Sequence, residues 1–380
     1  MPDHPLTSVG GGVIVEDEGP VGTPEPSEPA SEVASLGTAR QYLAGASDAN
    51  GLVYAIGGAV DGFDPASVVE QYDPGTDTWT TVASLGTARQ RLSAASDADG
   101  LIYAMGGISD ANTFETVVER YDPATDTWTT VASLGTERRE FAGASDADGL
   151  IYAIGGRSDS NNQEPVVEQY DPSTDTWTTV ASLGTPRSNL AGASDANGLI
   201  YAMGGVSDAD SRETVVEQYD PATDTWTTVA SLGTGRRDLA GASDANGLIY
   251  AMGGHSTGVE YDTVVEQYDP AADTWTTVGP LGTGRKQFAA ASDADGLIYA
   301  MGGESSANTF ETVVEQLQFG PIFADAYTAS GDTLFTADDA DAEILNRTTG
   351  RVSNPNVARD GETIAWVVES QARLVRTEEQ

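Results

Sequence analysis

The sequence predicts an all-β fold, a β-propeller of six blades with a small β-rich C-terminal appendage. Three observations predict it. A unit of 49 residues recurs in five complete copies and an incomplete sixth without insertion or deletion, each complete unit divides into four short strand-like segments, and no segment shows convincing helical periodicity. Four antiparallel strands in a unit of this size are typical of a propeller blade.

The repeat is defined by residues that return at the same spacing. A double glycine closes the octapeptide GLIYAMGG or a close variant in every unit. The six pairs begin at Gly57, Gly106, Gly155, Gly204, Gly253 and Gly302. Because five tryptophans and six arginines keep the same step, the units are expected to be equivalent blades.

The fourth unit shows how each blade is expected to be built. Its four segments are LAGAS (190–194), LIYAMGG (199–205), TVVEQYD (214–220) and TWTTV (225–229). Their lengths, and the Gly, Asp, Asn and Pro residues between them, suit strands joined by turns. Asn-Gly and Asp-Gly in the first turn supply the positive φ that a tight hairpin needs.

The sixth unit lacks its last strand. After ETVVEQ the chain reads LQFGP, with no tryptophan. The segment SEVASLGTAR at 31–40 aligns with TTVASLGTAR at 80–89, so it has the sequence of a fourth strand with no blade before it. We expect this N-terminal strand to complete blade six, because an open ring would expose sheet edges. Ala30 stands where the other units have tryptophan, which predicts the weakest strand of the ring.

The repeat resembles the kelch motif. A double glycine ends the second strand, a Tyr-Asp pair such as Tyr72-Asp73 follows, and Trp79 stands six residues later. The resemblance covers 31–319. It implies that the rim carrying the second-to-third loops and the links between blades is the ligand face. The recurrent Tyr and Trp residues are expected to fill the space between blades, so that they and the recurrent glycines have structural roles.

Two segments lie outside the repeat. Residues 1–30 are acidic and rich in Gly, Pro, Ser and Glu, which predicts a disordered N-terminal tail. Residues 320–380 contain four strand-like stretches, DTLFTADD, AEILNR, ETIAWVV and ARLVRT. They are expected to form a small separate sheet or a divergent blade.

Charge limits the classes of partner. The 380-residue chain has 59 acidic and 18 basic residues, a net charge of −41, and Lys286 is its single lysine. Such a surface repels nucleic acid and anionic membranes, and neither is an expected partner. The composition resembles that of proteins from salt-loving microbes; an ordinary acidic protein is the alternative, which the scarcity of lysine disfavours.

The sequence does not determine the cellular compartment of the protein. It has no cysteine, no apolar run long enough to insert into a membrane, and no signal-peptide pattern at its start. We therefore expect either a cytoplasmic protein or an extracellular one whose signal lies outside this chain.

The candidate binding residues come from positions where the copies disagree. The turns on one face barely change, whereas the loops and links of the other face differ strongly. Two residues after each recurrent arginine stand Tyr42, Arg91, Glu140, Asn189, Asp238 and Gln287. The residue after the double glycine adds Arg157, His255 and Glu304. We interpret these nine as a ligand-binding rim; unrestrained drift of long surface loops is the alternative.

The six recurrent arginines allow two interpretations. They are Arg40, Arg89, Arg138, Arg187, Arg236 and Arg285. A ring of guanidinium groups at a channel mouth could hold a carboxylate. Each arginine could instead tie one blade to the next through loop carbonyls, and the perfect recurrence favours this structural role. The variable Arg91, Arg157, His255, Arg237 and Lys286 are better ligand candidates, suited to an acidic peptide or a sugar acid.

Catalytic and metal-binding patterns are weak. The only histidines are His4 and His255, so neither a zinc site nor a Ser-His-Asp triad is expected, and the Asp-x-Asp-Gly turns are explained as hairpins rather than calcium loops. We expect no cofactor and no metal. Paired carboxylates at one mouth of the propeller, such as Glu140 and Asp238, leave glycoside hydrolysis as an alternative.

The function expected from the sequence is a non-catalytic kelch-repeat scaffold that offers its rim to a protein or glycan. Among kelch enzymes, those like galactose oxidase need cysteine and histidines that this chain lacks. Others act on sialic-acid-like sugars through rim Arg, Glu and His residues. Arg157, His255 and Glu304 keep a sugar-acid-modifying, sialic-acid epimerase-like enzyme as an alternative, and an extracellular adhesion module is a further one.

Overall fold

A computed structural model describes 30–60, 63–110, 113–158, 162–207, 211–307 and 309–317, together with the backbone of six short strands outside this range. By its internal contacts the chain divides into a unit of 28–318 and a second unit formed by 1–27 and 319–380. The described residues contain strands and turns and no helix.

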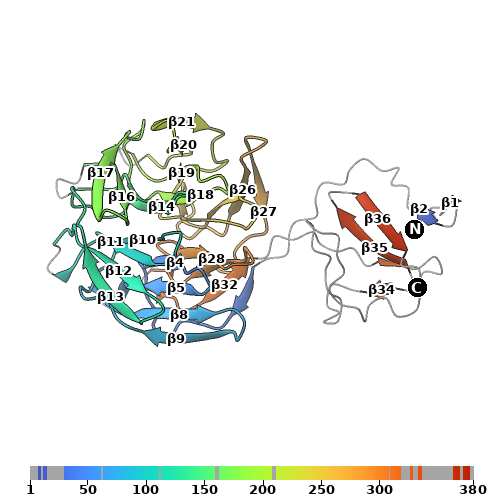
Figure 1. Cartoon of the computed structure of the whole chain (residues 1–380), viewed down its shortest axis with the longest axis horizontal. Coiled ribbons are helices and arrows are strands. Elements are labelled where there is room, and N and C mark those ends of the chain that lie inside the picture. Colours follow the sequence, from blue (N-terminus) through green and yellow to red (C-terminus); the bar gives the residue numbers. More distant parts are fainter. Residues whose placement is uncertain are drawn as a thin grey trace. The chain divides into compact units, whose positions relative to one another are not determined.

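The larger unit is a ring of six four-stranded antiparallel sheets, as the repeat predicts (Figure 1). Blades one to three are β4 (Ala44–Ser47), β5 (Val53–Ile56), β8 (Val69–Asp73) and β9 (Thr78–Val82); β10 (Ser93–Ser96), β11 (Ile102–Met105), β12 (Val118–Asp122) and β13 (Thr127–Val131); and β14 (Ala142–Ser145), β15 (Ile151–Ile154), β16 (Val167–Asp171) and β17 (Thr176–Val180).

The remaining blades repeat this order, and the last one is completed from the N-terminal side. They are β18 (Ala191–Ser194), β19 (Ile200–Met203), β20 (Val216–Asp220) and β21 (Thr225–Val229); β23 (Ala240–Ser243), β24 (Ile249–Met252), β26 (Val265–Asp269) and β27 (Thr274–Val278); and β28 (Ala289–Ser292), β29 (Ile298–Met301), β32 (Val314–Leu317) and β3 (Ser31–Val33).

The ring is closed. β3 pairs antiparallel with β32 from Ser31↔Gln316 to Val33↔Val314, so the N-terminal strand fills the place left by the incomplete sixth unit. The innermost strands also form a circle, because each packs against the innermost strands of both neighbouring blades and β28 packs against β4.

The hydrophobic core lies between the blades rather than at one centre. One cluster joins β5 and β8 of blade one to β11 and β12 of blade two, and similar clusters fill the other described seams. Tyr72 shows the packing. Its ring lies 5.1 Å from Trp79 in its own blade and 5.2 Å from Tyr299 in blade six, and it is almost fully buried.

A polar clamp accompanies each aromatic seam. The indole of Trp79 donates to the Ala34 carbonyl at 2.8 Å, and the Ala34 N–H donates to Asp77 at 2.8 Å. The same contacts recur at Trp128, Trp177, Trp226 and Trp275. The outer strand of one blade is thereby fixed to the link that leaves the blade before it.

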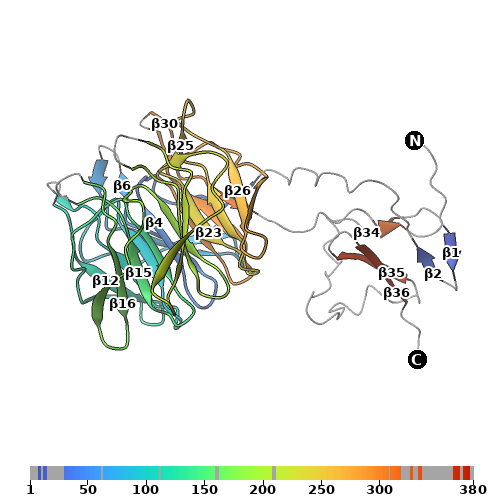
Figure 2. The same ribbon diagram turned by 90° about the horizontal axis from the view of Figure 1, so that it is seen from above.

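Short ladders occur on the loops of one face. They are β6 (Ala59–Val60) with β7 (Asp64–Pro65), β22 (Arg236–Arg237) with β25 (His255–Ser256), and β30 (Glu304–Ser306) with β31 (Thr309–Phe310). In Figure 2, β6, β25 and β30 lie along one edge of the propeller. These ladders shape the loops of the expected ligand face.

The second unit consists of strand pairs. β1 (Thr7–Val9) pairs with β2 (Gly12–Ile14), inside the segment expected to be disordered. β33 (Ala326–Tyr327) pairs with β34 (Thr333–Phe335), and β35 (Thr363–Val368) with β36 (Gln371–Arg376). The expected strand AEILNR lies outside the described residues.

Candidate functional site

Six backbone hydrogen bonds form a closed circle around the propeller axis. Tyr42 N–H donates to the Gln287 carbonyl at 2.7 Å, and Arg91 N–H donates to the Tyr42 carbonyl at 2.9 Å. The circle continues through Glu140, Asn189 and Asp238, with donor–acceptor distances from 2.7 to 3.2 Å, and returns to Gln287. The six variable positions that follow the recurrent arginines are therefore neighbours at one end of the axis.

All six of these residues have a left-handed backbone, with φ between 54° and 57°. This region is sparsely populated by residues other than glycine and costs free energy that the surrounding structure must offset. Here the hydrogen-bond circle and the buried arginines beside it hold the backbone in place. The conformation turns six consecutive links toward the axis.

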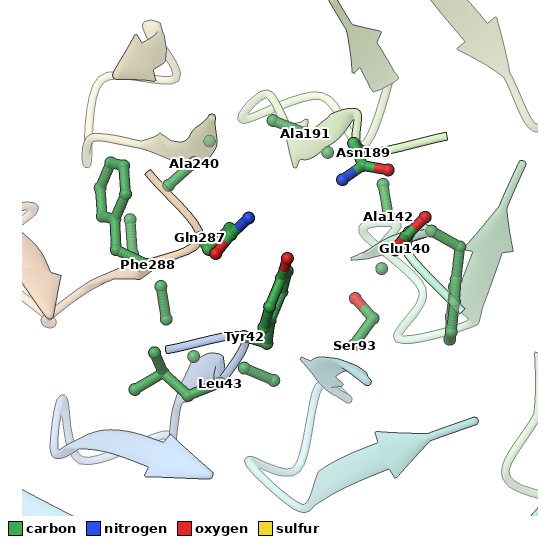
Figure 3. Close-up of a pocket in the computed structure, with 18 of the residues that line it drawn as sticks. Tyr42, Leu43, Ser93, Glu140, Ala142, Asn189, Ala191, Ala240, Gln287 and Phe288 are labelled. Atoms are coloured by element: carbon green, nitrogen blue, oxygen red, sulfur yellow. The ribbon is translucent and has the colours of Figure 1, made fainter. Parts of the chain in front are cut away.

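These six residues, Tyr42, Arg91, Glu140, Asn189, Asp238 and Gln287, are called the axial ring below, and their side chains interact with one another. The Arg91 guanidinium lies 3.7 Å above the centre of the Tyr42 ring and forms an ion pair with Glu140. The Asn189 amide donates to Asp238. Figure 3 shows Tyr42, Gln287, Asn189 and Glu140 converging on a central space.

This space is a cavity of about 150 Å³. Its wall is made by the axial ring and by the small and apolar residues that follow it, such as Leu43, Ala44 and Phe288, with Ser93 as a polar exception. It has room for roughly five water molecules. The cavity combines an apolar wall with a mouth of aromatic, cationic, anionic and amide groups, a combination typical of ligand pockets.

Burial shifts the pKa of two side chains of the axial ring. The pKa of Asp238 is raised because the carboxyl group is buried and Glu140 adds negative charge, although the hydrogen bond from Asn189 and the charge of Arg237 oppose the shift. Burial also raises the pKa of Tyr42. Gln287 Oε1 is buried and accepts no hydrogen bond from the described residues.

A second circle of variable residues surrounds the first. The residue after each recurrent arginine pairs with the residue after the double glycine, as in Arg139↔Arg157, Arg237↔His255 and Lys286↔Glu304. Lys286 Nζ lies 3.0 Å from Glu260 and 3.4 Å from Glu304. The second circle therefore places cations from three blades next to the axial ring.

His255 lies among cations. Its Nε2 is 2.9 Å from Arg212 Nη2. Burial lowers its pKa, and the charges of Arg212, Arg237 and Lys286 lower it further. Because arginine can only donate, Nε2 accepts, and the imidazole is neutral near neutral pH.

The structure thus separates the nine candidate residues into two groups. Tyr42, Arg91, Glu140, Asn189, Asp238 and Gln287 meet at the axis. Arg157, His255 and Glu304 lie one step outward on three different blades, where His255 contacts Arg212 and Glu304 contacts Lys286.

Sequence reasoning did not single out Arg139, Arg212 or the loop phenylalanines. A signal for Arg139 was present, because it follows a recurrent arginine as Arg237 and Lys286 do. Arg212 and Phe63 lie in loops without an informative pattern, whereas Phe114 and Phe310 occupy the same place in the segment ANTFET of units two and six. Their positions become visible only when the loops are placed side by side.

The recurrent arginines are buried in the scaffold. Arg40 Nη1 donates to the carbonyls of Gly57 and Val68 in blade one, each at 2.9 Å, and Nη2 lies 2.5 Å from Glu70. Its backbone bonds to blade six, since the Gly303 N–H donates to the Arg40 carbonyl at 2.9 Å. Each guanidinium side chain is 0% exposed and pairs with a buried glutamate. This geometry is that of a tie between neighbouring blades.

Within the described residues, no three acidic or histidine side chains gather closely enough to hold a metal ion. No helix among them could span a membrane.

Comparisons with known proteins agree with this architecture. The family model of the KLHDC2/KLHL20/DRC7 Kelch-repeats domain matches 44–236, and that of the Kelch motif matches 236–282. No curated protein matches the chain. The solved structure of YjhT superimposes with a TM-score of 0.65 at 16% identity, covering 76% of this chain and 97% of that one. The first family model alone spans more than half of the chain, and the chain belongs to the kelch-repeat family.

Proposed function

We propose that this protein is a non-catalytic binding scaffold that takes a protein or glycan ligand on the face carrying the axial ring. One observation carries the proposal. The positions at which the blades differ most in chemistry are brought together around one cavity mouth, on backbone that is fixed by a closed hydrogen-bond circle. Pre-organised groups bind with a smaller loss of conformational entropy than mobile ones.

The chemistry of the axial ring suits a specific ligand rather than a general one. Tyr42 offers an aromatic face, Arg91 a cation, Glu140 an anion and Gln287 an amide oxygen without a partner among the described residues. A buried polar group that only the correct ligand satisfies discriminates strongly against other ligands.

The proposal is tested with a variant in which the ring is uniform. Replacing Tyr42, Arg91, Glu140, Asp238 and Gln287 by asparagine copies the residue of blade four at every position. Asparagine tolerates the left-handed backbone, so the fold should persist while the chemistry is lost. Affinity capture at high salt, followed by mass spectrometry, should recover partners with the wild type and lose them with this variant.

A matched control changes the other face. Asp99, Asp148 and Asp295 stand in first-to-second turns where the remaining blades have asparagine. A D99N/D148N/D295N variant should retain every partner. Equal recovery by the wild type and the uniform-ring variant would show that the axial ring is not the binding site.

A second candidate function is catalysis on an acidic sugar. The observation that favours it is the position of His255 beside Arg212, which combines a proton-transferring side chain with a cation for the sugar carboxylate. Incubation with sialic acid, followed by NMR, tests this function. Turnover that disappears in an R157A/H255A/E304A variant would support the enzyme, and alanine is the residue that blade one has at the same position.

A further inference from the structure

A strained aromatic residue is exposed on the loop of blade one. Phe63 is 46% exposed, and its backbone is left-handed with a φ of 65°. This conformation is unusual for a bulky side chain and costs free energy. In the described part of the chain, Val259 is the only other large hydrophobic residue that is exposed. Because costly conformations cluster at functional sites, Phe63 marks a candidate contact surface.

Three blades hold Phe63 in place. Its ring packs against Phe310 of blade six, with ring centres 5.6 Å apart and ring planes at 73°. Its carbonyl accepts a hydrogen bond of 2.8 Å from the side chain of Gln90, on the link that enters blade two. The pairing of β6 with β7 fixes its own hairpin. A partner can therefore bind this ring with little loss of conformational entropy, at the seam between blades six and one.

The residue after each ring is acidic. Asp64 follows Phe63 and is exposed, and its carboxylate forms no ion pair with a residue that the structure describes. Glu311 follows Phe310 and is half-buried, where it accepts a hydrogen bond from Ser305. An exposed carboxylate beside an apolar surface favours a partner that brings a positive charge and an apolar group together.

The accessible cations on the links of the adjoining blades already have carboxylate partners. Lys286, on the link that enters blade six, lies 3.0 Å from Glu260 and 3.4 Å from Glu304. Arg91, on the link that enters blade two, pairs with Glu140. The charge that this surface can still accept is therefore positive. The net charge of −41 also disfavours a second copy of the chain as the occupant.

We propose that Phe63, Asp64 and Phe310 form a docking surface for a protein segment that carries a basic side chain next to an apolar one. The basic side chain binds Asp64, and the apolar one packs on the exposed part of the Phe63 ring. The surface lies on the loops of blades six and one, outside the axial ring (Figure 2). The inference therefore goes beyond the proposed function and can fail separately from it.

The experiment uses the immobilised full chain and synthetic peptide pools as probes. One pool fixes an arginine next to a leucine, a second replaces the arginine by glutamine, and a third replaces the leucine by serine. All are measured at one salt concentration, because salt screens the charge contact. The wild type should retain the first pool roughly 3-fold more than the second and about 10-fold more than the third, as expected for an exposed charge pair and a buried apolar side chain.

Two variants assign the two halves of the preference, and both introduce residues that blade three has at the same positions. D64N should lower the ratio of arginine to glutamine retention roughly 3-fold and keep the preference for leucine. F63N/F310Q should do the reverse. Asparagine tolerates the left-handed backbone, so the fold should persist, and melting curves check it.

Three control variants leave this surface intact. The whole acidic chain attracts cationic peptides, so D99N removes one carboxylate from the other face as a match for D64N. Arg120→Gln removes a cation from β12 and places there the residue of the other blades. The variant with a uniform axial ring tests the proposed function instead. All three should keep both preferences of the wild type.

Four outcomes would overturn the inference. Equal retention of the three pools by the wild type, or a wild-type ratio in D64N, excludes a basic and apolar segment. Retention of a neutral oligosaccharide that F63N abolishes, without retention of any peptide pool, makes the ring a sugar platform. A dimer in sedimentation that F63N dissociates identifies a second copy as the occupant. Peptide retention that appears only in R373E/R376E identifies this chain's own strand β36.

Discussion

Arg187 Nη2 donates to Glu217 Oε2 at 2.7 Å, between side chains that are 0% and 5% exposed. Burial lowers the pKa of Arg187 to about 10, against the opposing charge of Glu217. The arginine remains charged at neutral pH. Each blade contains one such buried charge pair, and removing one partner would leave the other charge buried alone.

Removing one partner of this pair should strongly destabilise the fold. Arg187→Met leaves Glu217 buried without its counter-ion and removes donors from the Gly204, Val215 and Ala202 carbonyls. We expect a loss of about 3–5 kcal/mol in the free energy of unfolding. Denaturant unfolding at high salt measures it, with Arg120→Gln as a nearly neutral control. A loss below ~1 kcal/mol would show that the buried pair does not stabilise the fold.

The closing strand should be essential for a monomeric ring. Deleting 1–36 removes β3 and the buried Leu36, and it leaves the edge of β32 without its partner. Because exposed edges pair with other chains, this variant should melt earlier and associate with increasing concentration. Deleting 1–29 keeps β3 and should do neither. Melting curves and sedimentation distinguish the two, and an unchanged monomer after the longer deletion would contradict closure.

Strain in the axial ring should be measurable at Gln287. Its φ of 57° suits glycine and asparagine and is costly for a β-branched residue. Unfolding measurements should rank Gln287→Asn at or above the wild type and Gln287→Val below it by about 1–2 kcal/mol. A valine variant as stable as the wild type would mean that the ring backbone relaxes without cost.

The Asp238 carboxyl should give a pH-dependent difference between two proteins. Because its pKa is raised above the ordinary 3.8, the folded state binds this proton more tightly than the unfolded chain does. The wild type should lose stability relative to Asp238→Asn as the pH rises from about 3.8 through the raised pKa. Above that window the difference should stay constant. Melting temperatures of both proteins across the acid range check it, and a pH-independent difference would contradict the buried carboxyl.

Salt should stabilise the protein. The net charge of −41 repels itself in dilute buffer, whereas at 1 M salt the screening length falls to about 3 Å. Circular dichroism should show a higher melting temperature in molar salt than in dilute buffer. Equal melting under both conditions would exclude the halophile-like interpretation of the composition.

The repeated parts of the fold were predictable because the same pattern occurs six times in the sequence. The double glycine at Gly57 and the TWTTV strand at Trp79 appear as expected, and the alignment of 31–40 with 80–89 anticipated the pairing of β3 with β32. Glu70 was a missed signal. It and its five equivalents keep the same 49-residue step as the arginines that they pair with.

The site was less predictable, because it depends on how the blades face one another. The variable positions around Tyr42 could be grouped by register, but their hydrogen-bond circle and left-handed φ angles are properties of the closed ring. The neighbours Arg139 and Phe114 come from different blades, and no spacing within one unit reports their contact.

The pairing of β3 with β32 sets an order of events during synthesis. The ribosome releases Val33 long before it makes Val314, and at typical elongation rates the interval is on the order of tens of seconds. Throughout that time β3 has no partner strand within its own polypeptide. Closure of the propeller therefore waits until its earliest-made strand is captured by its last blade.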